Sequence, residues 1–233
     1  MSSTSEQRDA CNPAFAVTRS LLGWGVVVGP FYLAVGVVLG LTRKGFDFAR
    51  HPLSLLMLGE WGWLQAANLI LSGLMTIAAA LGFARAMGGS KWPGILVGGY
   101  GACLIVSGIF SPDPMAGFPP GAAPSEGSVS GLLHLMFGLI GFLLLAAACF
   151  VVAAWTGRRG ETPWAMYSRV TGTLVIVGFL GGGVLSSQVL GVVALWIAVV
   201  AGWAWLAATS VRLYRIAPHP DAQRRQPEAR AQG

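Results

Sequence analysis

The chain alternates six long apolar runs with short polar connections, and this pattern is its clearest structural feature. A helix needs about 20 predominantly apolar residues to cross the hydrocarbon core of a bilayer. The third run is the shortest and the richest in glycine. The pattern predicts six transmembrane spans: Ser20–Thr42, Trp61–Ala84, Gly94–Phe110, Gly131–Trp155, Ala165–Ser187 and Leu190–Leu213.

These spans predict an all-α fold. Irregular chain and open sheets cannot cross lipid, because their backbone N–H and C=O groups would find no hydrogen-bond partner there. We therefore expect a bundle of six transmembrane helices that forms a single membrane domain at residues 20–213. The segments 1–19 and 214–233 have too little apolar content to fold alone, and we expect them to be disordered extensions.

Positive charge is concentrated on one side of the predicted bundle. Of the 15 Lys and Arg residues, only Arg43, Lys44 and Arg50 lie in the first, third and fifth connections. The others lie in the N-terminal arm, in the second and fourth connections with their span ends, and in the C-terminal tail. The positive-inside rule then predicts that both termini face the cytoplasm. We expect a multi-pass protein of the bacterial cytoplasmic (inner) membrane, with its basic edges close to anionic membrane lipids.

The formal net charge of +6 does not indicate nucleic-acid binding. The basic residues are scattered along predicted membrane edges and have no aromatic residues between them, so they are typical of topology anchors. The cysteines, Cys11, Cys103 and Cys149, are odd in number and lack the spacing of metal ligands or of a disulfide framework. The sequence thus predicts no metal site, and its motifs indicate no cofactor.

Candidate chemistry lies on the side opposite the charges. The first outer connection contains Arg50, His51 and Glu60, and the second, which is the longest loop, begins with Asp113. His134 falls in the first turn of the fourth span, at the same level as Asp113. Ionisable residues at this depth are costly unless they meet water or a partner. We therefore expect these five residues to line the mouth of a pocket that opens to the non-cytoplasmic face.

Two stripes of polar residues continue from this mouth into the membrane. Helical geometry at 3.6 residues per turn brings the polar residues of the second span onto one face. The third span carries a similar stripe that leads to Asp113. The first stripe contains Gln65, Asn68, Ser72 and Thr76, and the second contains Tyr100, Cys103, Ser107 and Ser111. Deeper in the pocket we expect ligand contacts from Gln65, Asn68, Ser107 and Tyr100.

Purely structural roles remain open for the same residues. Asp113 lies between two prolines and could cap backbone amides in a turn. His134 could be a hydrogen-bonded residue at a helix start. Asp47, Arg50 and Glu60 could form an interfacial set of salt bridges that holds the loop and has no chemical role. The amides and hydroxyls of the first stripe could simply bond to a neighbouring helix.

Four segments of the chain are similar to a known family. They are HPLSLLMLGEWGWLQAANLILSGL at His51–Leu74, GIFSPDPMAGFPPGAAP at Gly108–Pro124, GLLHLMFGLIGFLLLAAACFV at Gly131–Val151 and WAMYSRVTG at Trp164–Gly172. In these the chain resembles the six-span bacterial and archaeal membrane proteins classed as domain of unknown function 998. The resemblance covers nearly the whole membrane domain, supports the six-span fold and singles out Asp113 and His134, but implies no activity.

The chain departs from that family at the start of the fourth span. Similar sequences read His-Gly-Leu-Leu-His where this chain has Ser130-Gly131-Leu132-Leu133-His134. A role that needs two histidines there, such as metal binding, is therefore not expected.

Three functions from different classes fit the sequence. In the first, which we favour, the outer pocket binds a lipid, an isoprenoid or another hydrophobic small molecule, and Asp113, His134 and Arg50 hold its headgroup. In the second, the protein is a membrane-embedded enzyme in which Asp113 or Glu60 acts as a general acid with His134, for example in a terpene-like cyclisation. In the third, it is a structural or assembly subunit. The sequence also leaves a homo-oligomer open.

Overall fold

The computed structural model describes residues 13–123, 126–186 and 188–217. Within these residues the chain forms six α-helices, one short 3-10 helix and no β-strand. All six α-helices are long and apolar enough to cross a membrane, so the predicted all-α, six-span architecture is confirmed. The elements are α1 (Pro13–Thr42), η2 (Leu53–Met57, the 3-10 helix), α2 (Gly62–Ala86), α3 (Trp92–Ile109), α4 (Val129–Arg158), α5 (Thr162–Val184) and α6 (Val189–Ile216).

Helix α1 begins earlier than the predicted start at Ser20. Proline is favoured in the first turn of a helix, where its missing N–H costs nothing, and Pro13 begins α1. Arg19, which we expected in a disordered arm, is helical and lies with its guanidinium carbon 3.9 Å from the ring centroid of Tyr214. It also donates a hydrogen bond of 3.2 Å to the carbonyl of Ala217. The start of α1 is thus held against the end of α6, while the rest of the predicted arm and most of the predicted tail lie outside the described residues.

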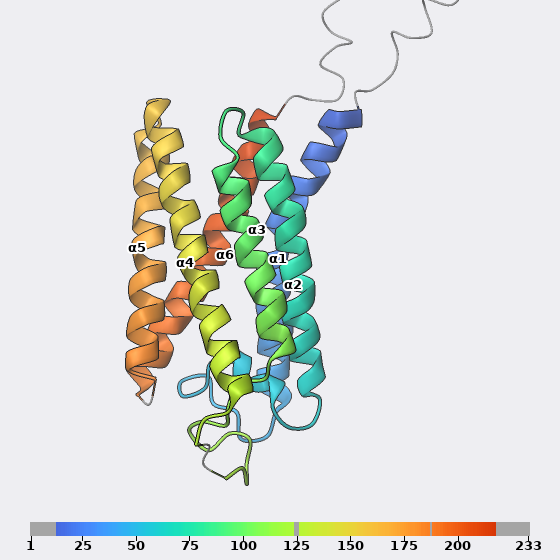
Figure 1. Ribbon diagram of the computed structural model, residues 1–233, viewed down its shortest axis with the longest axis vertical. Helices are drawn as coiled ribbons and strands as arrows, with labels where there is room; N and C mark the ends of the chain where they lie inside the picture. The colour runs from blue at the N-terminus through green and yellow to red at the C-terminus, as the bar shows by residue number, and fades with distance from the viewer. Residues whose placement is uncertain (1–12, 124–125, 187, 218–233) are drawn as a thin grey trace, which may run out of the picture.

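Consecutive helices run antiparallel and pack side by side, and α6 returns to contact α1, so the six helices form a closed ring (Figure 1). We use "basic end" for the end that holds Arg19 and residues 85–92, 158–162 and 212–217. We use "loop end" for the other, which holds residues 43–61, 110–123, 126–128, 185–186 and 188. The described chain starts and finishes at the basic end, at the top of Figure 1. The orientation of this end toward the cytoplasm stays a prediction.

Small residues let the helices approach closely. A Cβ added to Gly73 of α2 would lie 2.6 Å from the carbonyl oxygen of Gly101, and one added to Gly101 of α3 would lie 2.7 Å from that of Gly73. Such contacts between small residues are typical of helix pairs in lipid, where close van der Waals packing drives association. Larger side chains fill the centre, where the indole of Trp203 on α6 lies between the rings of Tyr32 and Tyr100, at centroid distances of 5.4 and 5.6 Å.

The loop end is closed by an ordered cap, which consists of residues 43–61 and 110–123. Helix η2 turns its apolar side chains inward, and Leu55 and Leu56 are almost completely buried. Leu53 reaches α1, where a Cβ at Gly36 would lie 2.7 Å from its Cδ1 atom. Phe118 from the second loop is also buried, and its ring packs edge-on against Phe46 of the first loop at 5.4 Å. The two loops therefore share one apolar core at the loop end of the bundle.

Candidate functional site

His51, a predicted ligand-binding residue, lies inside the cap and is only 3% exposed. Its Nδ1 atom accepts a hydrogen bond of 2.9 Å from the backbone N–H of Asp47. Because an atom that accepts from an N–H carries no proton, the ring proton is on Nε2, which donates to the carbonyl of Ala116 at 3.2 Å. The rings of Phe46 and Phe118 both pack against the imidazole at 5.4 Å. His51 thus joins the two loops through Nε2, while Nδ1 binds the backbone of its own loop.

Arg43, Arg50 and Glu60 differ in how they relate to the cap. Arg43 donates hydrogen bonds to the carbonyls of Leu56 and Leu58 at 3.0 and 2.6 Å, and so holds the end of η2. Burial lowers the pKa of Arg43 from its ordinary value, while the nearby carboxylate of Glu60 raises it. Glu60 and Arg50 are exposed. In the described part of the chain Asp47, Arg50 and Glu60 form no ion pair with one another, so the expected set of salt bridges is wrong.

Asp113 and His134 form hydrogen bonds that connect the end of α3 to the start of α4. The carboxylate of Asp113 accepts hydrogen bonds from the backbone N–H of Ser128, the N-cap residue of α4, at 3.0 and 3.3 Å. In return, Nδ1–H of His134, in the first turns of α4, donates to the carbonyls of Ser107 and Phe110 at 2.9 and 2.8 Å. The loop that follows α3 thus supplies a carboxylate to the start of α4, and α4 supplies an imidazole to the end of α3.

This exchange decides what the pair can do chemically. A carboxylate at a helix N-terminus is stabilised as the anion by the N–H groups and the helix dipole. The bonded Nδ1–H of His134 likewise defines one tautomer and leaves Nε2 as the nitrogen that can accept a proton. Both residues have a structural task in the fold, of the kind that the sequence had left open for them. Among the described residues no group of three His, Cys, Asp or Glu side chains is placed to hold a metal ion.

The polar stripe of α2 is fully inside the bundle. Gln65, Ser72 and Thr76 are 0% exposed and Asn68 is 2% exposed. The Asn68 amide donates to the carbonyl of Tyr32 on α1 and to Oε1 of Gln65, each at 3.1 Å. The Nε2 atom of Gln65 is buried without a hydrogen-bond partner among the described residues. The stripe therefore links α2 to α1 and leaves one amide group unused.

Tyr100 and Ser107 on α3 are also buried, but they face different neighbours. Tyr100 packs against Trp203 of α6 and against Phe142 of α4, at centroid distances of 5.6 and 5.9 Å. The hydroxyl of Ser107 donates to the carbonyl of His134 at 3.4 Å. Ser107 thus lies with His134 at the α3–α4 junction, and Tyr100 lies in the aromatic centre of the bundle. The predicted residues do not all line one pocket.

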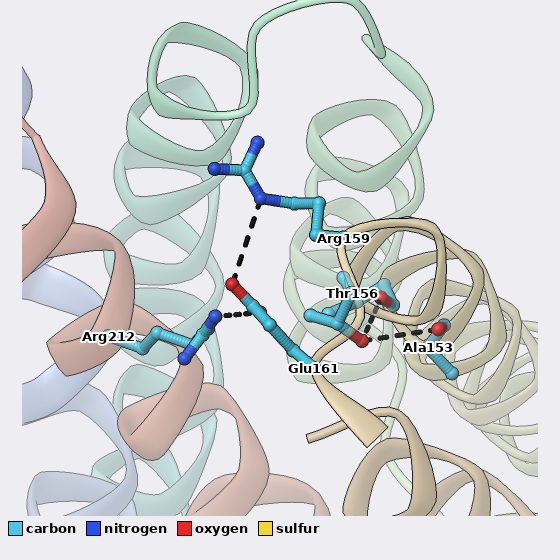
Figure 2. A network of polar contacts seen from close by, with 6 residues as sticks. Ala153, Thr156, Arg159, Glu161 and Arg212 are labelled. Atoms are coloured by element: carbon cyan, nitrogen blue, oxygen red, sulfur yellow. Dashed lines mark hydrogen bonds and ion pairs between the residues drawn. The ribbon is translucent and has the colours of Figure 1, made fainter. Parts of the chain in front are cut away.

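The basic end contains the ion pairs that the described residues form (Figure 2). Glu161, in the connection between α4 and α5, lies between two arginines. Its Oε1 atom is 3.7 Å from Nε of Arg159, and its Oε2 atom accepts a hydrogen bond from Nη2 of Arg212 on α6. Each guanidinium also lies over an indole ring: Arg159 over Trp155 at 4.5 Å, and Arg212 over Trp164 at 4.8 Å.

Two adjoining surface cavities lie next to this network, between α5 and α6. One has a volume of about 300 Å³ and the other of about 440 Å³, and they share Trp164 and Ala208 in their walls. Together we call them the α5–α6 groove. It is lined by Pro163, Trp164 and Tyr167 of α5 and by Ala208, Val211, Arg212, Arg215 and Ile216 of α6.

The groove was not predicted from the sequence, where Arg212 and Arg215 have the pattern of topology anchors. The sequence does contain one sign of the groove, in the spacing of residues on the last span. Ala208, Arg212 and Arg215 recur at helical spacing, so they share one face of the last span. That face changes from small and apolar to cationic toward the end of the helix. What the spacing could not show is that Trp164, at the start of the preceding span, forms the opposite wall.

Comparison with known proteins places the chain in one family. A family model described as "Protein of unknown function (DUF998)" matches residues 26–212, which is most of the chain and nearly all of the described bundle. No curated protein and no solved structure matches the chain.

Proposed function

This chain belongs to the DUF998 family of proteins of unknown function, and from its own geometry we propose that it binds a membrane lipid in the α5–α6 groove. The proposal keeps the class of ligand that the sequence favours, a hydrophobic molecule with a polar headgroup. It moves the site from the loop end to the basic end.

The observation that carries the proposal is the composition of the groove. Its two adjoining hollows, of about 300 and 440 Å³, are open and lie on the outer surface of a membrane-spanning helix pair. Ala208, Val211 and Tyr167 give an apolar wall, whereas Arg212 and Arg215 stand at the basic end of the same groove. A ligand that matches this lining is apolar along one part and polar at one end, as a membrane lipid is.

The loop end offers less support for ligand binding. His51, Asp113 and His134 all hold backbone groups of the protein itself, and the cap buries Phe118 and the apolar side chains of η2. A ligand there would have to displace bonds that stabilise the fold. The groove is open to the surface, and a ligand there displaces no backbone hydrogen bond of the fold.

The test fills the groove with a large side chain. We expect Ala208→Trp to abolish retention of a lipid that co-purifies with the wild-type protein from its native membrane, as measured by mass spectrometry after mild detergent extraction. The matched control is Ala204→Trp, which adds the same side chain to an exposed position one helical turn earlier on α6, outside the groove lining. Equal lipid retention by both variants and the wild type, or no retained lipid in the wild type, would exclude the proposal.

A further inference from the structure

We infer that the α5–α6 groove selects phospholipids with an anionic headgroup, whose phosphate binds Arg212 and Arg215 in place of the internal carboxylate of Glu161. This inference rests on the proposed lipid-binding function and names the headgroup and the residue that competes with it.

The first step is the placement of charge along the groove. Ala208 and Arg215 are separated by seven positions on α6, which at 1.5 Å per residue corresponds to about 10 Å along the helix axis. Over that length the lining changes from alanine and valine to two arginines. On α5 the chain runs the opposite way, and Trp164 lies at the charged level while Tyr167 lies deeper. The charged level therefore corresponds to the headgroup region, and the deeper level to the start of the acyl chains.

The second step is the net charge at that level. Arg159 and Arg212 flank a single carboxylate, that of Glu161, and Arg215 lines the same groove. Each oxygen of the carboxylate already faces one guanidinium (Figure 2). Arg215 is exposed in the wall of the groove and adds a further positive charge. The site thus retains an excess of positive charge after its internal ion pairs are formed, which favours an anion over a zwitterion.

The third step is the unused hydrogen-bonding capacity of Arg212. A guanidinium has five N–H donors in a planar fork that suits the paired oxygens of a phosphate. In the described residues Arg212 uses Nη2 for Glu161, while its Nε atom is buried and has no hydrogen-bond partner. Trp164 lies under the guanidinium plane at 4.8 Å and orients it. A phosphate that replaced this carboxylate would bring additional oxygen acceptors to the same guanidinium.

The apolar part of the groove favours a membrane lipid as the source of the anion. The groove runs along two membrane-spanning helices, and its apolar lining continues below the arginines. A free phosphate would contact only the charged level and would leave the apolar wall without a partner. A phospholipid covers both levels, so the inference commits to a lipid as the source of the phosphate.

The experiment measures headgroup preference with Trp164 as the reporter. The full-length protein is reconstituted in phosphatidylcholine vesicles that contain a fixed fraction of brominated phosphatidylglycerol or brominated phosphatidylcholine. Bromine quenches nearby indoles, and the Trp164 signal is the difference between the wild type and Trp164→Phe. We expect brominated phosphatidylglycerol to quench this signal more strongly than brominated phosphatidylcholine, with a preference of about tenfold, the size expected from one or two charge-assisted hydrogen bonds.

Three variants separate the specific site from bulk charge. Arg212→Gln with Glu161→Gln keeps the net charge of the wild type but removes the fork, and we expect the preference to disappear. Glu161→Gln alone removes the competing carboxylate and should increase the preference. Arg169→Gln removes one positive charge from an exposed position on α5 outside the groove lining, and should leave the preference unchanged.

Several outcomes would overturn the inference and can be told apart from a failure of the proposed function. Equal quenching by the two lipids, with lipid retention still lost in Ala208→Trp, would keep the groove as a lipid site and reject the phosphate preference. A preference that Arg169→Gln lowers as much as the double variant would show a bulk charge effect. Relief of quenching by excess inorganic phosphate would assign the site to a soluble anion. If Ala208→Trp retains lipid as the wild type does, the lipid-binding function itself fails.

Discussion

The two ends of this bundle both concentrate polar side chains at the border of the same apolar helices, but they use them differently. At the loop end, His51, Asp113 and His134 bond to backbone groups and join elements that are neighbours in the fold. At the basic end, Arg212 and Arg215 line an open groove, and Glu161 only partly satisfies the guanidinium groups.

An ionisable residue near a membrane boundary therefore indicates a polar environment. It does not by itself indicate a binding site. A helix leaves four N–H groups at its start and four C=O groups at its end without intrahelical partners. Where two helices are joined by a long loop, side chains that satisfy those groups look like site residues in the sequence. Residues that bind an external molecule are better recognised by donors that the protein leaves unpaired next to a cavity.

The largest effect that would test this contrast is expected at His51. We expect His51→Ala to lower the free energy of unfolding by about 2–4 kcal/mol, because it removes two buried hydrogen bonds and the ring between Phe46 and Phe118. Thermal unfolding in one lipid mixture measures the change. His51→Phe keeps the ring but loses both hydrogen bonds, so its loss should be smaller. The matched exposed variant Arg50→Ala should change the stability by less than about 0.5 kcal/mol. A His51→Ala protein as stable as wild type would contradict the structural role.

A smaller effect is expected where α3 meets α4. His134→Ala leaves the carbonyls of Ser107 and Phe110 without their donor, and we expect it to cost about 1–2 kcal/mol of stability. Asp113→Asn weakens the contact with the α4 N-terminus and should cost about 1 kcal/mol. Denaturation of each single variant and of the double variant measures these losses. If the two residues instead form an acid–base pair that binds ligand, the variants would lose a retained molecule while keeping their stability.

The smallest effect on stability is expected at the basic end. Arg159 is about half exposed, and partly exposed ion pairs contribute about 0–1 kcal/mol. We therefore expect Arg159→Gln to change the free energy of unfolding by less than about 1 kcal/mol, as measured in the same unfolding experiment. The two ends would then differ in that buried, hydrogen-bonded side chains at the loop end matter for stability, whereas the ion pairs at the basic end do not. A loss as large as that of His51→Ala would remove the distinction between the two ends.

The fold was predictable because its strongest determinant is local. Runs such as Trp61–Ala84 must be helical in lipid for reasons that depend on no other part of the chain. The early start of α1 was not predictable in this way, because Arg19 is held by Tyr214 and Ala217 from the other end of the sequence. The cap was equally hidden, since His51 bonds to Ala116 across two separate loops.

The candidate site was harder to predict than the fold. Sequence spacing placed Asp113 and His134 at one level, but their partners are backbone atoms of Ser128, Ser107 and Phe110, and spacing carries no information about which backbone groups lack a partner. The groove depends on Trp164 and Ala208, which belong to different helices. Only the packing of α5 on α6 shows that they form one cavity.

The most direct test of the contrast between the two ends compares retained lipid in two variants: Ala208→Trp at the basic end, and Asp113→Asn with His134→Ala at the loop end. Mass spectrometry of the lipids that co-purify with each variant and with the wild type provides the measurement. The account predicts that the wild-type lipid is lost from Ala208→Trp and kept by the loop-end double variant. Loss of that lipid from the double variant, with full retention by Ala208→Trp, would contradict the account and return the site to the loop end.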